Sequence, residues 1–252
     1  MISAVRLEFF KSRRRGLLLT VLALFGFEIA WMFMAFRNPT AQEIQQGWKG
    51  LLYQMPPLNT IFFPIAAAIV ASRLADLEHK GETWKLLETI QDAKDIFMGK
   101  FLCGAWYVLL SIILETGAML LCGKLLAYDG SPDLEKYMLF LVFQFVTALE
   151  IFALQLILSS LIRNQMIPLC IGCGGCFIGL LLLFVPLKAA QYILPWGHSS
   201  LLYIVYLVYW NADQRTMLLA YNPIHWAAFV VAICELVVFL WIGCKLFHQK
   251  EV

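Results

Sequence analysis

Six long stretches of mostly apolar residues constrain this chain more than any other feature. A helix needs about 20 such residues to cross a lipid bilayer, and it must satisfy its own backbone hydrogen bonds because hydrocarbon offers no partners. Apolar residues make up 61% of the 252 residues and charged residues only 14%, against about 25% charged in soluble domains. The sequence therefore predicts an all-α integral membrane protein, a single domain over residues 1–252 with six transmembrane helices. The expected spans cover about residues 16–36, 58–75, 101–121, 137–162, 166–187 and 224–247.

The basic residues between the spans set the expected orientation. Cytoplasmic loops of membrane proteins carry an excess of Lys and Arg. With the N-terminus inside, most of these residues fall on the inner side, including five before the first span and five from Arg73 to Lys100. We therefore expect both termini in the cytoplasm and a cytoplasmic loop over residues 76–95.

Two segments outside the spans have apolar character of their own. Residues 1–15 mix apolar and basic side chains, which suits an interfacial helix on the inner membrane surface. Residues 189–222 contain an apolar run, Leu201 to Trp210, that is too short to span a bilayer. We expect this outer segment to form short helices, re-entrant or interfacial, before the last span.

The 76–95 loop contains a short amphipathic pattern. Leu86, Leu87 and Ile90 fall on one stripe of a helix that begins at Glu82, and Trp84 lies beside them. Charged residues take the opposite side. A helix of this kind either docks on a soluble partner or lies on the lipid surface, and the residue pattern leaves both interpretations open.

No sequence motif points to an enzyme, because the P-loop, the G-x-S-x-G elbow and the H-E-x-x-H pair are missing from the sequence. Cys170, Cys173 and Cys176 repeat a C-x-x-C spacing among glycines, without a nearby histidine. We therefore predict neither a metal site nor a cofactor in this chain. Gly175 and Gly179 form a small-xxx-small pattern, which favours close packing of helices.

Four glutamates within the expected spans are candidates for a substrate site. An ionised side chain at bilayer depth costs a few kcal/mol, so such residues are usually paired or functional. One interpretation is a cavity that attracts cations or protons. The other is a set of protonated carboxyl groups that join helices, with Gln144, Thr147 and Gln155 as hydrogen-bond partners. The four residues are Glu28, Glu115, Glu150 and Glu235.

The arm and the loop also resemble a known family. The arm contains E-F-F-K-S-R-R-R, and the second span runs into A-S-R-L-A-D-L-E-H-K-G-E-T-W-K-L-L-E-T before Lys100 opens the third. This pattern is similar to that of permease subunits of ABC-2 type transporters, and within them to the lantibiotic-protection and bacitracin-resistance branch. Two departures stand out: Glu82 is an extra residue after the glycine, and Gln91-Asp92-Ala93 stands where the family often has a proline.

The resemblance implies a permease that does not itself hydrolyse ATP. Two permease subunits, identical or related, would pair with a cytoplasmic ATPase dimer that holds ATP and Mg²⁺. The loop helix would fit a cleft on the ATPase, with Trp84, Leu86 and Leu87 as its apolar anchors. The residues assigned to this coupling contact are Glu78, Gly81, Glu82, Thr83, Trp84, Lys85, Leu86, Leu87 and Glu88.

The resemblance therefore implies a permease subunit of an exporter in a bacterial cytoplasmic membrane, whereas the spans alone predict only a protein of a lipid bilayer. Its expected substrate is a peptide antibiotic, and a cationic peptide would suit an outer cavity with Glu28 and Glu115. Membrane lipid is the other expected partner, and no nucleic acid is expected. Two alternatives stay open: export of a different substrate, such as a lipid-linked molecule or an ion, and a non-transporting membrane sensor of antimicrobial peptides.

Overall fold

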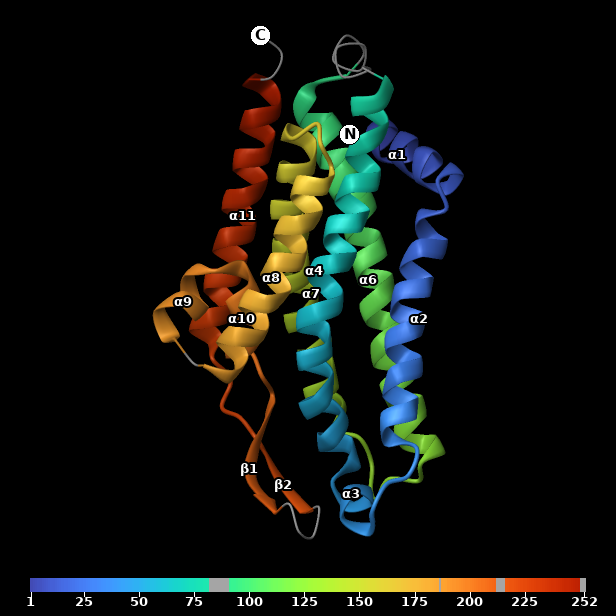
Figure 1. The fold of residues 1–252 in the computed structure, drawn as a ribbon, viewed down its shortest axis with the longest axis vertical. Coiled ribbons are helices and arrows are strands. Elements are labelled where there is room, and N and C mark those ends of the chain that lie inside the picture. Colours follow the sequence, from blue (N-terminus) through green and yellow to red (C-terminus); the bar gives the residue numbers. More distant parts are fainter. Residues whose placement is uncertain (82–90, 186, 212–215, 250–252) are drawn as a thin grey trace.

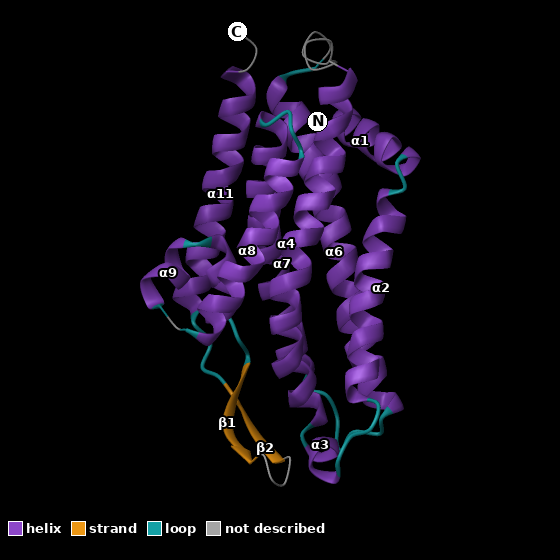
Figure 2. Ribbon diagram, in the orientation of Figure 1, coloured by secondary structure: helices purple, strands orange, loops and turns teal. Residues whose placement is uncertain are grey.

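The protein is a bundle of long helices. The computed structural model describes residues 1–81, 91–185, 187–211 and 216–249, and helices dominate these residues (Figure 2). Within them, six helices are long and apolar enough to cross a membrane, which confirms the expected number of spans. They lie side by side along one axis (Figure 1). The six are α2 (Leu17–Phe36), α4 (Gly47–Gly81), α6 (Ala93–Leu125), α7 (Leu134–Leu161), α8 (Met166–Phe184) and α11 (Trp226–Gln249).

Helices α4 and α6 extend well beyond the spans that the apolar pattern predicted. Helix α4 begins at Gly47, not near Leu58, and α6 begins at Ala93, not near Phe101. The added turns of α6 carry Asp95 and Lys100, which a hydropathy pattern leaves outside a span. The polar network described below is built on these added turns.

Helices α4, α6 and α7 form the centre of the bundle. Each buries more than half of its most apolar stretch, whereas α2, α8 and α11 bury a third or less. Helix α2 is an example of an outer helix, because only one stripe of it is buried. The buried residues recur at spacings of three and four, and they are Leu17, Val21, Phe25, Glu28 and Met32. Of the other α2 side chains, some pack at the edge of the core, as Leu24 and Phe33 do, and others are exposed, as Leu19 and Phe27 are. Such an exposed apolar face is expected for a helix that borders lipid.

The N-terminal arm forms a helix, α1 (Ile2–Arg14), set at an angle across one end of the bundle (Figure 1). Gly16 has a φ of +62°, a conformation that suits glycine, and the chain turns there into α2. The residues that α1 buries are Ala4, Glu8 and Ser12, one turn apart. We call this the arm end of the bundle, and the last described turns of α11 lie at the same end (Figure 1).

The segment before α11 corrects one expectation. Two short helices are present, α9 (Lys188–Ile193) and α10 (Pro195–Leu201), but they are followed by a pair of strands, β1 (Val205–Asn211) and β2 (Thr216–Tyr221). The strands pair antiparallel and extend beyond α9 and α10 to the end of the bundle where α3 (Ala41–Gln45) also lies, which we call the hairpin end (Figure 1). The prediction of helices alone was wrong for residues 205–211 and 216–221. The apolar run from Leu201 to Trp210 is rich in Val, Tyr and Trp, which favour strands. Its ten residues are too few for a helix that crosses a membrane.

The side chain of Gln46 joins the hairpin to the bundle through hydrogen bonds to the backbone of β2. Gln46, which follows α3 (Ala41–Gln45), donates from Nε2 to the carbonyl of Met217 at 3.1 Å and accepts from the amide of Leu219 at 2.8 Å. The side-chain amide therefore pairs with one carbonyl and one amide of β2, as the backbone of a neighbouring strand would.

A belt of buried polar side chains divides the core. One apolar cluster, which includes Phe25, Phe63 and Ile112, lies towards the arm end, and another, which includes Met32 and Met119, lies towards the hairpin end. Along the helices, the belt of buried polar side chains, or polar belt, lies between these two apolar clusters. Its members are Glu28, Asn59, Thr60, Glu115, Thr116, Gln144 and Thr147, all buried.

Candidate functional site

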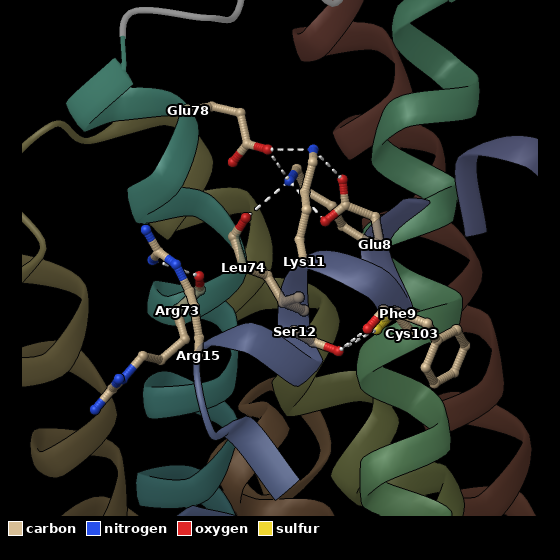
Figure 3. A network of polar contacts seen from close by, with 10 residues as sticks. Glu8, Phe9, Lys11, Ser12, Arg15, Arg73, Leu74, Glu78 and Cys103 are labelled. Carbon is tan, nitrogen blue, oxygen red and sulfur yellow. Dashed lines mark hydrogen bonds and ion pairs between the residues drawn. The ribbon is translucent and has the colours of Figure 1, made fainter. Parts of the chain in front are cut away.

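The most concentrated polar contacts lie at the arm end, where α1 crosses α4 and α6 (Figure 3). The helices approach closely there, since a Cβ added to Gly99 of α6 would lie 3.1 Å from the Cβ of Ala4. One turn further along α1, Glu8 is buried with a relative exposure of 3%. A carboxylate at such a contact needs a cation beside it.

Two lysines supply that charge. The Lys100 ammonium, with a fully buried side chain, lies 3.1 Å from Glu8 Oε2 and 2.9 Å from Glu78 Oε1, and it donates to the carbonyl of Leu74 at 2.7 Å. Lys11 lies 2.9 Å from Glu8 Oε1 and 2.8 Å from Glu78 Oε1. Two carboxylates and two ammonium groups thus balance in one buried cluster, which we call the arm network.

The arm network also sets the ionisation of Lys11. Burial alone would lower the pKa of Lys11, but the charges of Glu8 and Glu78 and their hydrogen bonds outweigh it, so the pKa lies above its usual value. Lys11 therefore stays charged at neutral pH, and the cluster remains balanced.

Further contacts fasten the same helices. The Arg15 guanidinium donates to the carbonyl of Arg73 at 3.2 Å and lies 3.6 Å from Asp76. The hydroxyl groups of Ser12 and Tyr107 are 3.0 Å apart and join α1 to α6. The N-terminal amine forms an ion pair with Asp95. The arm is therefore a bundle element packed on protein, and not only a helix that lies on lipid.

The arm network flanks the segment to which the family resemblance assigned coupling. Most of that assignment, namely Glu82, Thr83, Trp84, Lys85, Leu86, Leu87 and Glu88, lies outside the described residues. Of the other two residues, Gly81 is exposed at the end of α4, and Glu78 lies one turn earlier with its side chain 1% exposed. The Glu78 carboxylate faces Lys11 and Lys100, so here it positions helices and presents little surface to a partner protein.

Two of the four intramembrane glutamates lie in the polar belt. Asn59 donates to Glu115 Oε1 at 2.9 Å, and the carboxyl groups of Glu28 and Glu115 interact electrostatically. Both glutamates are fully buried. Two of the three expected partners are engaged elsewhere: Thr147 donates to the carbonyl of Phe143 at 3.0 Å, and the Gln155 amide, in the orientation that satisfies both of its groups, pairs with Pro168 and Gly172. The third, Gln144, is buried in the belt, and its Nε2 has no hydrogen-bond partner among the described residues.

The other two glutamates lie beside a histidine. Nδ1 of His198 on α10 is 2.9 Å from Glu150 Oε2 on α7, and the side chains of both are fully buried. One ligand atom from each of Glu150, His198 and Glu235 lies within 4.8 Å of the others. Sequence reasoning missed this cluster because His198 is far from both glutamates in the chain. The only signal was a histidine in an otherwise apolar segment.

Gly175 and Gly179 of α8 lie where helices touch. A Cβ at Gly175 would overlap the indole ring of Trp196 on α10, and one at Gly179 would meet the methyl group of Thr60 on α4. Both contacts are within the subunit. The third cysteine of the C-x-x-C repeat, Cys176, is buried and donates to the carbonyl of Ile61 at 3.3 Å.

A cavity of about 580 Å³ lies at the hairpin end, between α2, α4, α8, α10 and β1. Its wall is mostly apolar and contains several aromatic side chains, among them Trp31, Tyr53, Tyr203 and Tyr206. Its lining also includes Met32, one turn from Glu28, and Leu58, next to Asn59. The cavity therefore ends close to the polar belt, although the belt glutamates are buried and do not line it.

Comparison with known families identifies the architecture. A family model described as ABC-2 family transporter protein matches residues 4–181. The chain belongs to the ABC-2 transporter family. The match covers the arm, the α4–α6 connection and nearly all of the first five membrane helices, whereas α9, α10, the hairpin and α11 lie beyond it. No curated protein matches the chain. As an ABC-2 permease, the protein is a multi-pass membrane subunit of a transporter and not itself a catalytic enzyme, and the family implies association with an ATPase component.

Proposed function

We propose that this ABC-2 permease receives the movement of a cytoplasmic ATPase dimer through residues 82–90 and passes it to the bundle through the arm network. One observation carries the proposal: Glu78 and Lys100, which flank that segment, are joined at 2.9 Å in a buried cluster that also holds α1. Breaking a buried ion pair costs several kcal/mol. A displacement of the last turn of α4 is therefore expected to carry α6 and α1 with it.

This arrangement divides the coupling residues into two groups. Trp84, Leu86 and Leu87 act as apolar anchors on the ATPase, with Lys85 and Glu88 at the rim, because aromatic and aliphatic anchors usually carry most of the energy of an interface. Glu78 acts as a positioning residue, since its carboxylate is held by Lys11 and Lys100. The arm end faces the cytoplasm in this proposal, in agreement with its excess of basic residues.

Co-purification tests the coupling contact. The ATPase chain should be recovered with the wild-type permease and lost with the Trp84→Ala/Leu87→Ala double variant. Trp106→Ala is the matched control, because Trp106 is 52% exposed and lies inside α6, beyond Lys100 and outside the coupling segment. Equal recovery of the ATPase with the double variant and with the control would remove the docking proposal.

The proposed substrate is a peptide antibiotic of the lantibiotic type, expelled from the membrane by a bacterial transporter with two permease subunits. Three features support this choice. The loop resembles that of peptide-protection permeases, the hairpin-end cavity is rich in aromatic side chains, and two buried carboxyl groups, Glu28 and Glu115, lie close behind it. A cationic amphipathic peptide combines the apolar and positive groups that such a path would accept.

A panel of antimicrobial peptides tests the substrate. Cells that carry the Glu28→Gln/Glu115→Gln variant should lose protection against cationic peptides while the permease still co-purifies with its ATPase. Glu43→Gln, which changes a carboxylate of the exposed capping box of α3, should keep full protection. Unchanged protection in the double variant would refute the role of the two glutamates. A wild-type permease that co-purifies with its ATPase but protects against none of the peptides would favour export of another substrate.

A further inference from the structure

The cluster of Glu150, His198 and Glu235 has a chemistry that the transport proposal does not use. It joins three elements, since Glu150 lies on α7, His198 on α10 and Glu235 on α11. We propose that these three side chains form a binding site for a divalent transition-metal cation, with Zn²⁺ as the probe. The site is independent of the coupling loop and of the belt glutamates.

The hydrogen bonds of His198 prepare one nitrogen for a metal. Nε2 lies 3.2 Å from the carbonyl of Tyr192, and a carbonyl only accepts, so Nε2 carries the proton. In the neutral imidazole, Nδ1 is then the bare nitrogen. It lies 2.9 Å from Glu150 Oε2, a contact that needs a proton on the carboxyl group when no metal is bound, and a metal cation would take the place of that proton between the two atoms. Histidines that bind metals usually donate their other ring N–H to a carbonyl or carboxylate in this way.

The Glu150 carboxylate is a second, independent indication of a metal site. Its side chain is fully buried, and its Oε1 accepts no hydrogen bond among the described residues. A buried carboxylate oxygen without a partner is costly. Two carboxylates and a neutral imidazole carry two negative charges, which one divalent cation balances. Without a cation, two such carboxyl groups at close range cannot both be ionised.

The distances fit a small cation after modest adjustment. Zinc bonds of about 2.1 Å in tetrahedral geometry separate the ligand atoms by roughly 3.4 Å. The three ligand atoms here lie within 4.8 Å of one another, so side-chain movements of about 1 Å close the site. One nitrogen and two carboxylate ligands suit Zn²⁺ and leave a fourth position for water.

A metal at this site would fasten α10 between two membrane helices. Helix α10 carries Ser200, which lines the hairpin-end cavity, and Trp196, which packs on Gly175. Bound metal would therefore fix one wall of the cavity. His198 and Glu235 lie beyond the part of the chain that matches the ABC-2 family, whereas Glu150 lies within it.

Metal uptake by the full-length protein in detergent tests the proposal. The wild type should retain one Zn²⁺ per chain after dialysis, and His198→Gln and Glu235→Gln should each weaken binding at least tenfold, since even outer-shell changes cost about 10–100-fold. Co²⁺ in place of Zn²⁺ should give the visible spectrum of a four-coordinate site without a thiolate charge-transfer band. Added Zn²⁺ should raise the unfolding temperature of the wild type but not of Glu235→Gln.

Two controls keep the result decisive. Cys170→Ser/Cys173→Ser removes two exposed thiols and should leave binding unchanged, as should Glu43→Gln. Glu235 is only half-buried, so Glu235→Gln decides the matter if His198→Gln fails to fold. The proposal is overturned if the wild type takes up no zinc, if the ligand variants bind as the wild type does, or if loss of the thiols abolishes binding. A proton shared by Glu150 and His198 would then account for the cluster.

Discussion

Replacing Lys100 by methionine should strongly destabilise the protein. The change keeps an unbranched side chain, one atom shorter, but removes a charge that lies 2.7–3.1 Å from three acceptors inside the arm network. Glu8 and Glu78, with side chains 4% and 1% exposed, would then share Lys11 alone. Removing one partner of a buried ion pair costs about 3–5 kcal/mol, because the remaining charge is left uncompensated.

The measurement is thermal unfolding of the full chain in detergent. At about 2–4 °C per kcal/mol for chains of this size, the loss corresponds to roughly 6–20 °C in Tm. Lys80→Met is the matched control, since Lys80 pairs with Asp76 at 2.8 Å but its side chain is 75% exposed. An exposed pair contributes at most about 1 kcal/mol.

A double variant tests the electrostatic reasoning itself. Glu78→Gln/Lys100→Met leaves one carboxylate and one ammonium group, Glu8 and Lys11, which lie 2.9 Å apart. It should therefore recover part of the stability that Lys100→Met loses, with a coupling energy of about 0.5–3 kcal/mol. The balanced network would be refuted if Lys100→Met were as stable as Lys80→Met. It would also be refuted if the stability losses of the two single changes simply added in the double variant.

Three further predictions concern other parts of the molecule. Gly175→Ala should lower stability by about 1–3 kcal/mol through overpacking against Trp196, whereas Gly174→Ala, with open space around its Cβ, should not; equal effects would contradict the contact. Gln46→Ala should speed hydrogen exchange at the Leu219 amide, which Gln46 accepts from at 2.8 Å, while exposed Gln45→Ala should leave that rate unchanged. Because Glu8 and Glu78 raise the pKa of Lys11 above its usual 10.5, its stabilisation is fully present below that pH and is lost as pH rises through the folded-state pKa. The stability difference between wild type and Lys11→Met should thus shrink only at alkaline pH, and a difference that grows there would reverse the assignment.

The membrane architecture could be predicted from sequence because it depends on local properties. Whether a stretch crosses a bilayer depends on its own length and polarity, so the spans near residues 16–36 and 137–162 became α2 and α7 with small shifts. Charged turns do not carry that signal, and the start of α6 was therefore missed by eight residues. The strands β1 and β2 were missed for a related reason. Their apolar run is equally consistent with a short helix, and only the pairing of Val205 with Tyr221 and its neighbours separates the two.

What only the tertiary structure decided is which polar residues meet. The four intramembrane glutamates were visible in the sequence, but nothing local separates Glu115, which meets Asn59 on α4, from Glu150, which meets His198 on α10. The arm network likewise joins Glu8 to Lys100, 92 residues apart. A buried charge takes whichever partner the packing of the helices brings within about 3 Å, and that choice is a property of the whole bundle. Local hydropathy thus predicts six helices long and apolar enough to cross a membrane, and the packing of those helices selects which of the charged side chains meet.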